Sequence, residues 1–130
     1  LQQPKRNVYC FDGDGAFIMH MGSLASIGKS HPANFRHVVF NNLAHESVGG
    51  QPTLADVLDI PAIAEASGYE SWVSATTEAE IGQRLEVIQN AAGPSLLEIR
   101  VDTGSRADLG RPEKTPRENK EEFMNSLDQM

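Results

Sequence analysis

Two short stretches hold the residues of this sequence whose types and spacing are best suited to chemistry. They are Gly13-Asp14-Gly15 and the pair Asn41-Asn42. Glycines on both sides of an aspartate let backbone N–H groups approach phosphate oxygens closely, and the carboxylate is a hard ligand for a small cation such as Mg²⁺. The side-chain carbonyl of Asn42 and the backbone oxygen of Ala44 are further oxygen ligands. Together these groups predict a site for a metal-bound diphosphate.

The segments around the two stretches are expected to bring them together. Asn7–Phe11 is rich in β-branched and aromatic residues without polar alternation, which is typical of a strand covered on both faces, and Phe35–Phe40 is expected to be a second buried strand. Between them, Ala16–Ile27 has apolar residues at helical spacing, and Gly28 is the expected C-terminal stop of that helix. Strand, helix and strand predict a parallel sheet with a right-handed crossover. Ligands of such sheets bind outside the carboxyl ends of the strands, where both stretches fall.

The rest of the chain continues to alternate between strands and helices. We expect helices at Asp59–Gly68 and Thr76–Ala92, and strands at Tyr69–Val73 and Ser95–Val101. Asp59 and Thr76 are the expected N-caps, with Ala79 interrupting a full capping box after Thr76. The predicted fold class is therefore α/β, a three-layer domain with a mostly parallel sheet flanked by helices.

A change in composition after Val101 divides the chain. Residues 1–101 are expected to form a diphosphate- and Mg-binding α/β domain, and residues 102–130 the C-terminal arm and helix of the same domain. The helix is expected at Glu118–Met130, with its apolar residues Phe123, Met124 and Leu127 on one side. The basic residues of the arm are expected mainly to keep it soluble; they are Arg106, Arg111, Lys114 and Arg117.

Composition excludes several classes of protein. The chain has 130 residues, is 39% hydrophobic and carries a net charge of −7, which suits one globular domain and argues against a nucleic-acid surface. It has neither an apolar run long enough to span a membrane nor a secretory signal pattern. The single cysteine, Cys10, is expected to be a small buried hydrophobe, in keeping with a reducing, cytoplasmic setting. Because Leu1 is not a methionine, we expect a piece of a longer chain.

Other phosphate-binding patterns fit less well. A dinucleotide-binding G-x-G-x-x-G turn requires a third glycine where Ile18 stands, and no Gly-Lys-Ser/Thr follows as in a P-loop.

The spacing from Gly13-Asp14-Gly15 to Asn41-Asn42 resembles the motif of thiamine-diphosphate-dependent enzymes. More narrowly, residues 12–16, 19–24 and 41–53 are similar to the phosphonopyruvate decarboxylase family, and Gly110-Arg111-Pro112 with Pro116–Lys120 also match that family. Leu43 is a departure, because the family pattern has a glycine there, and we expect an altered loop backbone at this position.

The resemblance implies the diphosphate-binding domain of a decarboxylase that converts phosphonopyruvate to phosphonoacetaldehyde and carbon dioxide. It implies thiamine diphosphate and Mg²⁺ as cofactors, and a pyrimidine-binding domain or subunit as a partner that supplies the activating glutamate. The full protein is expected to be a homo-oligomer, and this chain alone is expected to be inactive. The alternatives are a sulfopyruvate decarboxylase, another thiamine-diphosphate enzyme, or a non-catalytic binding or assembly module.

The resemblance also assigns site residues. The cofactor-binding residues are Gly13, Asp14, Gly15, Ala16 and Asn42, and the metal ligands are Asp14, Asn42 and Ala44. In the polar loop that follows, His45 and Glu46 are the candidate catalytic residues, and Ser47 and Gln51 the candidate substrate contacts. Glu46 would repel a phosphonate, so a proton-transfer or structural role suits it better. His20 is expected to be a packing histidine.

Overall fold

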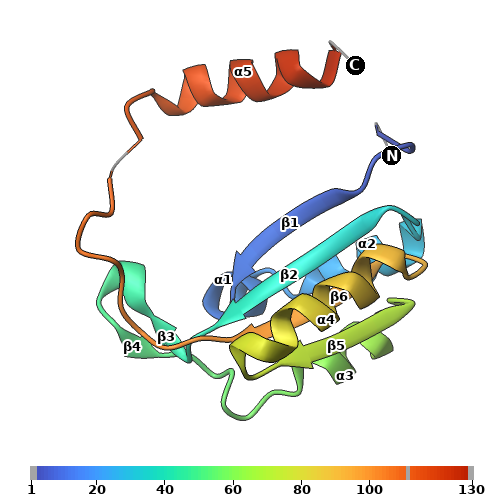
Figure 1. Ribbon diagram of the computed structural model, residues 1–130, viewed down its shortest axis with the longest axis horizontal. Helices are drawn as coiled ribbons and strands as arrows, with labels where there is room; N and C mark the ends of the chain where they lie inside the picture. Colours follow the sequence, from blue (N-terminus) through green and yellow to red (C-terminus); the bar gives the residue numbers. More distant parts are fainter. Residues whose placement is uncertain (1–2, 111, 129–130) are drawn as a thin grey trace.

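Parallel strands form the centre of the fold (Figure 1). The computed structural model describes residues 3–110 and 112–128. In this part of the chain the main sheet has four strands in the order β1-β2-β6-β5. They are β1 (Val8–Gly13), β2 (Phe35–Asn41), β5 (Ser71–Ala75) and β6 (Ser95–Arg100). Every neighbouring pair is parallel, as predicted.

Helices lie on both faces of this sheet (Figure 1). Because side chains alternate along a strand, Val38 and Val39 of β2 face opposite sides, as do Leu96 and Leu97 of β6. Val39 and Leu96 pack against α1 (Asp14–Met19), α2 (Gly22–Ser30) and α3 (Ile60–Ala66). Val38 and Leu97 pack against α4 (Glu78–Asn90). The predicted three-layer α/β fold class is confirmed.

A small hairpin and a long arm complete the structure. The hairpin consists of β3 (Ala44–His45), the 3₁₀-helix η1 (Glu46–Val48) and β4 (Gln51–Pro52). The arm runs past this hairpin and leads to α5 (Pro116–Asp128), which lies near the N-terminal segment (Figure 1). There the Gln3 amide donates a hydrogen bond to the Leu127 carbonyl, at 3.1 Å.

The C-terminal helix begins two residues earlier than predicted. The Glu118 carboxylate accepts hydrogen bonds from the backbone N–H and hydroxyl of Thr115, both at 2.7 Å, which fixes the first turn at Pro116. Phe123 and Met124 on this helix are exposed rather than packed into a core. Of the basic residues of the arm, Arg111 lies outside the described residues, as does the predicted end of the helix at Met130.

The predicted helix Ala16–Ile27 is in fact two helices, α1 and α2, separated at His20-Met21. The break allows Phe17 and Leu24 to enter the same core. Gly28 does not end α2, which continues to Ser30 and is followed by His31 in the left-handed conformation. Gly28 instead allows close packing, because a Cβ atom there would lie 1.8 Å from the Ser67 carbonyl oxygen.

Two further boundaries were wrong by one or two residues. The strand predicted at Tyr69–Val73 begins at Ser71, because the Tyr69 N–H donates to the Ala64 carbonyl and so closes the end of α3. The N-cap of α4 is Thr77 rather than Thr76, and Glu80 accepts hydrogen bonds from the backbone N–H groups of both threonines. The predicted N-cap Asp59 is confirmed by its hydrogen bond from the Ala62 N–H.

The prediction that β1 is covered on both faces is wrong. β1 is an edge strand, and α4 lies over β5 and β6 instead, so that Phe11 is 65% exposed. An entirely apolar hollow of about 450 Å³ remains on this side of the sheet, lined by Tyr9, Phe11, Val38, Phe40, Ile81, Leu85, Ile99 and Val101. Within the described residues, no helix has the length and apolar character needed to cross a bilayer.

Candidate cofactor site

The two polar stretches meet in one cavity at the carboxyl ends of β1 and β2. Its volume is about 390 Å³. It contains every residue predicted to bind cofactor or metal, together with His45, Glu46 and Ser47, whereas Gln51 does not line it. The lining residues are Gly13, Asp14, Gly15, Ala16, Met19, Phe40, Asn42, Ala44, His45, Glu46, Ser47, Val48 and Val101.

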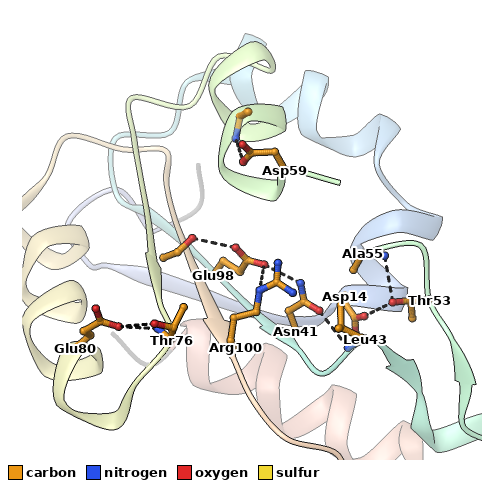
Figure 2. Close-up of polar contacts among 12 residues, drawn as sticks. Asp14, Asn41, Leu43, Thr53, Ala55, Asp59, Thr76, Glu80, Glu98 and Arg100 are labelled. Carbon is orange, nitrogen blue, oxygen red and sulfur yellow. Dashed lines mark hydrogen bonds and ion pairs between the residues drawn. The ribbon is translucent and has the colours of Figure 1, made fainter. Parts of the chain in front are cut away.

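Asp14 is the first residue of α1, and its side chain is buried, with 2% exposed. Its Oδ2 accepts a hydrogen bond of 2.5 Å from the hydroxyl of Thr53 (Figure 2). A buried carboxylate needs such a donor, because removing its charge from water is otherwise unfavourable. The first backbone N–H groups of an α-helix have no partner within the helix, and those of α1 lie beside the cavity.

The second side of the cavity is the turn that follows β2. The side chains of Asn41 and Asn42 accept hydrogen bonds from the backbone N–H groups two residues further on, at Leu43 (3.2 Å) and Ala44 (3.1 Å). These Asx-type contacts hold the turn that carries the predicted metal ligands. Leu43 adopts a positive φ of 61°, so the loop has the backbone conformation that glycine favours although the residue has a side chain.

His45 lies against the backbone of Gly15. A Cβ atom on residue 15 would be 2.5 Å from Nδ1 of the imidazole, so a side chain at this position would require the ring to shift. The second glycine of the motif thus allows β3 to approach α1 closely. His45 is half-buried at this contact and lines the cavity.

Both carboxylate oxygens of Glu46 are hydrogen-bonded. Oε2 accepts from the Asn42 amide at 2.8 Å, and Oε1 accepts from the backbone N–H of Gly104 in the arm at 2.5 Å. These bonds connect a predicted metal ligand to the arm. They favour the structural role for Glu46 over proton transfer, since the carboxylate is already engaged on both sides.

A buried glutamate is hydrogen-bonded to the turn that follows β2. Glu98 of β6 is 4% exposed and accepts hydrogen bonds from the Asn41 amide at 2.7 Å and the Ser74 hydroxyl at 2.9 Å. It also forms an ion pair with Arg100, at 3.1 Å (Figure 2). Asn41 therefore links the central strand β6 to the turn.

The sequence predicted no individual role for Asn41, apart from its place in the Asn41-Asn42 pair, and none for Thr53. Both lie within the stretch that carried the family resemblance, so the motif itself was a signal for them. Met19, the last residue of α1, also lies within a stretch that carried this resemblance. The apolar lining residues Phe40 and Val101 had no such signal as site residues, because only the ends of β2 and β6 bring them to the cavity. His20, expected to pack, is exposed, and its Nδ1 lies 3.2 Å from the Ala16 carbonyl oxygen.

A second polar cluster lies within the sheet, away from this cavity. His37 of β2 is buried, with Nε2 3.0 Å from Asp12 Oδ2 and Nδ1 3.1 Å from the Tyr69 hydroxyl. Burial lowers the pKa of His37, opposed by the hydrogen bond and charge of Asp12. Cys10, expected to be buried, is half-exposed beside them, and partial burial followed by the Asp12 charge raises the pKa of its thiol. Both ring nitrogens of His37 thus have hydrogen-bond partners within the cluster.

A three-layer α/β fold with a cavity at the carboxyl ends of its parallel strands is typical of nucleotide- or cofactor-binding domains. Residues 1–99 match the family described as "Thiamine pyrophosphate enzyme, C-terminal TPP binding domain". The chain belongs to this family, and its cofactor class is thiamine diphosphate.

Individual relatives are consistent with this assignment. The chain is 40% identical to a phosphonopyruvate decarboxylase of Streptomyces viridochromogenes over 113 residues, covering 87% of this chain and 28% of that protein. It is 28% identical to the sulfopyruvate decarboxylase subunit beta of Methanococcus maripaludis over 120 residues, covering 92% of this chain and 64% of the subunit. The chain thus spans about 28% of the length of its phosphonopyruvate decarboxylase relative.

A solved structure has the same fold. It is described as "X-ray structure of a putative thiamin diphosphate-dependent enzyme isolated from Mycobacterium smegmatis". The match has a TM-score of 0.62 and 24% sequence identity, and covers 77% of this chain and 19% of that one.

The residues of the cavity fit the cofactor of the family. The available groups are a carboxylate, a side-chain amide and a backbone carbonyl, which are the oxygen donors that Mg²⁺ prefers over softer metals. A Cβ atom at Gly13 would have no atom within 4 Å, so the space beside this turn is open where β1 leads into α1 at the cavity. Such an open turn suits a diphosphate held by backbone N–H groups.

Proposed function

We propose that this chain is the diphosphate- and Mg²⁺-binding part of a thiamine-diphosphate-dependent carboxy-lyase that decarboxylates phosphonopyruvate. The observation that carries the proposal is the meeting of Asp14, Asn42 and Ala44 in one cavity of a domain of this family. In this proposal these three residues bind Mg²⁺. Gly13 and the N–H groups of Gly15 and Ala16 receive the diphosphate.

These positions indicate which parts of the reaction the protein and the cofactor would each perform. Thiamine diphosphate supplies the electron sink that makes loss of carbon dioxide from a 2-oxo acid possible. The chain's own residues bind and orient it, and exclude water through the apolar lining of Met19, Phe40 and Val101. His45, against Gly15, is proposed to hold or deliver a proton near the reacting atoms. Glu46 is proposed to hold Asn42 in place.

The substrate proposal rests on relatedness. Among the relatives matched over more than 80% of this chain, the phosphonopyruvate decarboxylases are 40% and 37% identical and the sulfopyruvate decarboxylases 28% and 25%. A phosphonate or a sulfonate tail would be met by the polar loop, where Ser47 lines the cavity. Gln51 stands outside the lining and is proposed to contact substrate only if the hairpin moves toward the cavity.

A partner is part of the proposal. The subunit nomenclature of the sulfopyruvate decarboxylase relative supports an enzyme whose parts lie on more than one chain or domain. We propose that a pyrimidine-binding domain or subunit completes the site in a homo-oligomer, and that the open apolar hollow beside Phe11 and Phe40 is covered in this assembly. The arm, residues 102–130, is proposed to belong to the same domain as residues 1–101, tied to it by Glu46 and Gln3.

The test is cofactor binding by the complete protein. We expect thiamine diphosphate to bind in a Mg²⁺-dependent manner in titration calorimetry, with release of phosphonoacetaldehyde when phosphonopyruvate is added. Asp14→Asn is expected to weaken Mg²⁺ binding by more than about 100-fold. Loss of a residue that only hydrogen-bonds to a metal ligand weakens binding by at most about 100-fold, so a larger loss indicates direct coordination. Asp56→Asn, an exposed aspartate outside the cavity, is the matched control and should bind normally.

Two results would contradict the proposal in different ways. Consumption of sulfopyruvate but not phosphonopyruvate would reject the substrate while keeping the cofactor site. Absence of Mg²⁺-dependent binding in the complete assembly would instead favour the second candidate, a non-catalytic module that keeps only the fold.

A further inference from the structure

Thr53 is buried beside the candidate cofactor site and does not line its cavity. It follows β4 directly, and only 4% of the residue is exposed. A buried hydroxyl must be hydrogen-bonded to be tolerated, and this one has partners on both sides.

The two hydrogen bonds of the hydroxyl fix its direction. The Ala55 N–H donates to Thr53 Oγ1 at 3.3 Å, and the hydroxyl donates to Asp14 Oδ2 at 2.5 Å (Figure 2). Because one lone pair of Oγ1 is used by Ala55, its proton points to the carboxylate. One oxygen of Asp14 is thereby held by the protein, which fixes the rotation of the carboxylate at the cavity wall.

The backbone of Thr53 is hydrogen-bonded to the turn on the other side of the cavity. The Thr53 N–H donates to the Leu43 carbonyl at 3.0 Å. Leu43 lies between Asn42 and Ala44, the two predicted metal ligands of the turn. A single residue therefore bonds to the ligand on α1 and to the segment that carries the ligands after β2.

We propose that Thr53 is a positioning residue for the metal site, which sets the orientation of Asp14 relative to the turn of Asn42 and Ala44. The inference rests on the proposed function and adds a residue that makes no contact with the ion. It acts as an outer-sphere partner, a class whose loss weakens metal binding by about 10- to 100-fold.

Substitutions can separate the hydroxyl from the shape of the side chain. Thr53→Val keeps both branches at Cβ and removes the donor, and Thr53→Ser keeps the donor and removes the methyl group. Thr53→Ala removes the donor without the risk of overpacking. Thr76→Val is the matched control, since the Thr76 hydroxyl also donates to a carboxylate, Glu80, at 3.0 Å but outside the cavity.

The experiment measures Mg²⁺ affinity of the complete protein by calorimetry at saturating thiamine diphosphate, and the Mg²⁺ dependence of turnover. We expect Thr53→Val and Thr53→Ala to raise the dissociation constant for Mg²⁺ by at least about tenfold, with kcat recovered at saturating Mg²⁺. Thr53→Ser is expected to stay within about threefold of the parent, and Thr76→Val to match it. Circular dichroism without cofactor confirms that each variant is folded.

Three results would overturn the inference. They are unchanged Mg²⁺ affinity in folded Thr53→Val and Thr53→Ala, equal loss in Thr53→Ser, or equal loss in Thr76→Val. Failure of the parent protein to bind Mg²⁺ and thiamine diphosphate would be a different outcome, because it rejects the proposed function itself.

Discussion

Leu43 has a side chain on a backbone that glycine favours. Its φ of 61° lies in the left-handed region, which is unfavourable for residues with a Cβ atom by about 1–2 kcal/mol. The turn tolerates this conformation because the Asn41 side chain accepts from the Leu43 N–H and the Thr53 N–H bonds to the Leu43 carbonyl. Strain of this kind persists where surrounding contacts over-determine the backbone, as they do in the turn that carries the proposed metal ligands.

Replacing this leucine should therefore stabilise the protein. We expect Leu43→Gly to raise the free energy of unfolding by roughly 0.5–1 kcal/mol, because relief of the backbone strain exceeds the added entropy of glycine in the unfolded chain. The measurement is urea denaturation. Leu54→Gly is the control, an exposed leucine without positive φ, and it should lower stability. A lower stability of Leu43→Gly would show that the side chain contributes more than the backbone strain costs.

Among the elements, α2 and α4 show two different uses of glycine within a helix. Gly28 in α2 meets the Ser67 carbonyl at the end of α3, so it sets how closely the two elements pack under the sheet. Gly82 in α4 has no atom within 4 Å of a Cβ position. The same residue type thus serves packing in one helix and has no packing role in the other.

This difference predicts opposite effects of the same substitution. Gly28→Ala should lower the free energy of unfolding by about 2 kcal/mol or more, since rigid backbone must move to accept the methyl group. Gly82→Ala should raise it by roughly 0.5–1 kcal/mol, through the higher helix propensity of alanine. Thermal unfolding of the two variants decides the point. Equal shifts in the midpoint would contradict the packing role of Gly28.

At the scale of the whole molecule, His37 of β2 connects β1 with the segment that follows α3. Its two ring nitrogens lie within hydrogen-bonding distance of Asp12 on β1 and Tyr69 after α3. Burial raises the pKa of Tyr69, so its hydroxyl remains protonated at all ordinary pH values. Burial also lowers the pKa of His37 below its ordinary value of 6.5, so the native state keeps this ring neutral where the unfolded state binds a proton.

The free energy of unfolding should consequently decrease as the pH is lowered through a defined window. The contribution of His37 is complete above pH 6.5 and is lost as the pH falls below 6.5 toward the native pKa, by at most about 1.4 kcal/mol per pH unit. His37→Gln should flatten the dependence of the unfolding free energy on pH between about 6.5 and 5. Urea denaturation at several pH values measures both slopes. Tyr69→Phe, which keeps the ring buried, should retain the slope, and parallel curves for His37→Gln and the parent would refute this account.

Much of the fold and the centre of the site could be predicted from the sequence, because their signals are local. Largely apolar runs marked the buried strands β2 and β6, and Asp59 marked the start of α3. Gly13-Asp14-Gly15 and Asn41-Asn42 marked the cavity, since consecutive parallel strands end at the same edge of a sheet. The family assignment rests on the same residues.

The tertiary structure decided the contacts between segments that are distant in the sequence. That β1 has an open face depends on where α4 packs, and that Gly28 is a contact rather than a helix stop depends on Ser67. The link from Thr53 to both Asp14 and Leu43 requires the hairpin to fold back over α1. Local sequence determines which backbone and which donors are available. Only the packed structure determines which of them meet, because hydrogen bonds and close contacts depend on distances that the order of residues does not contain.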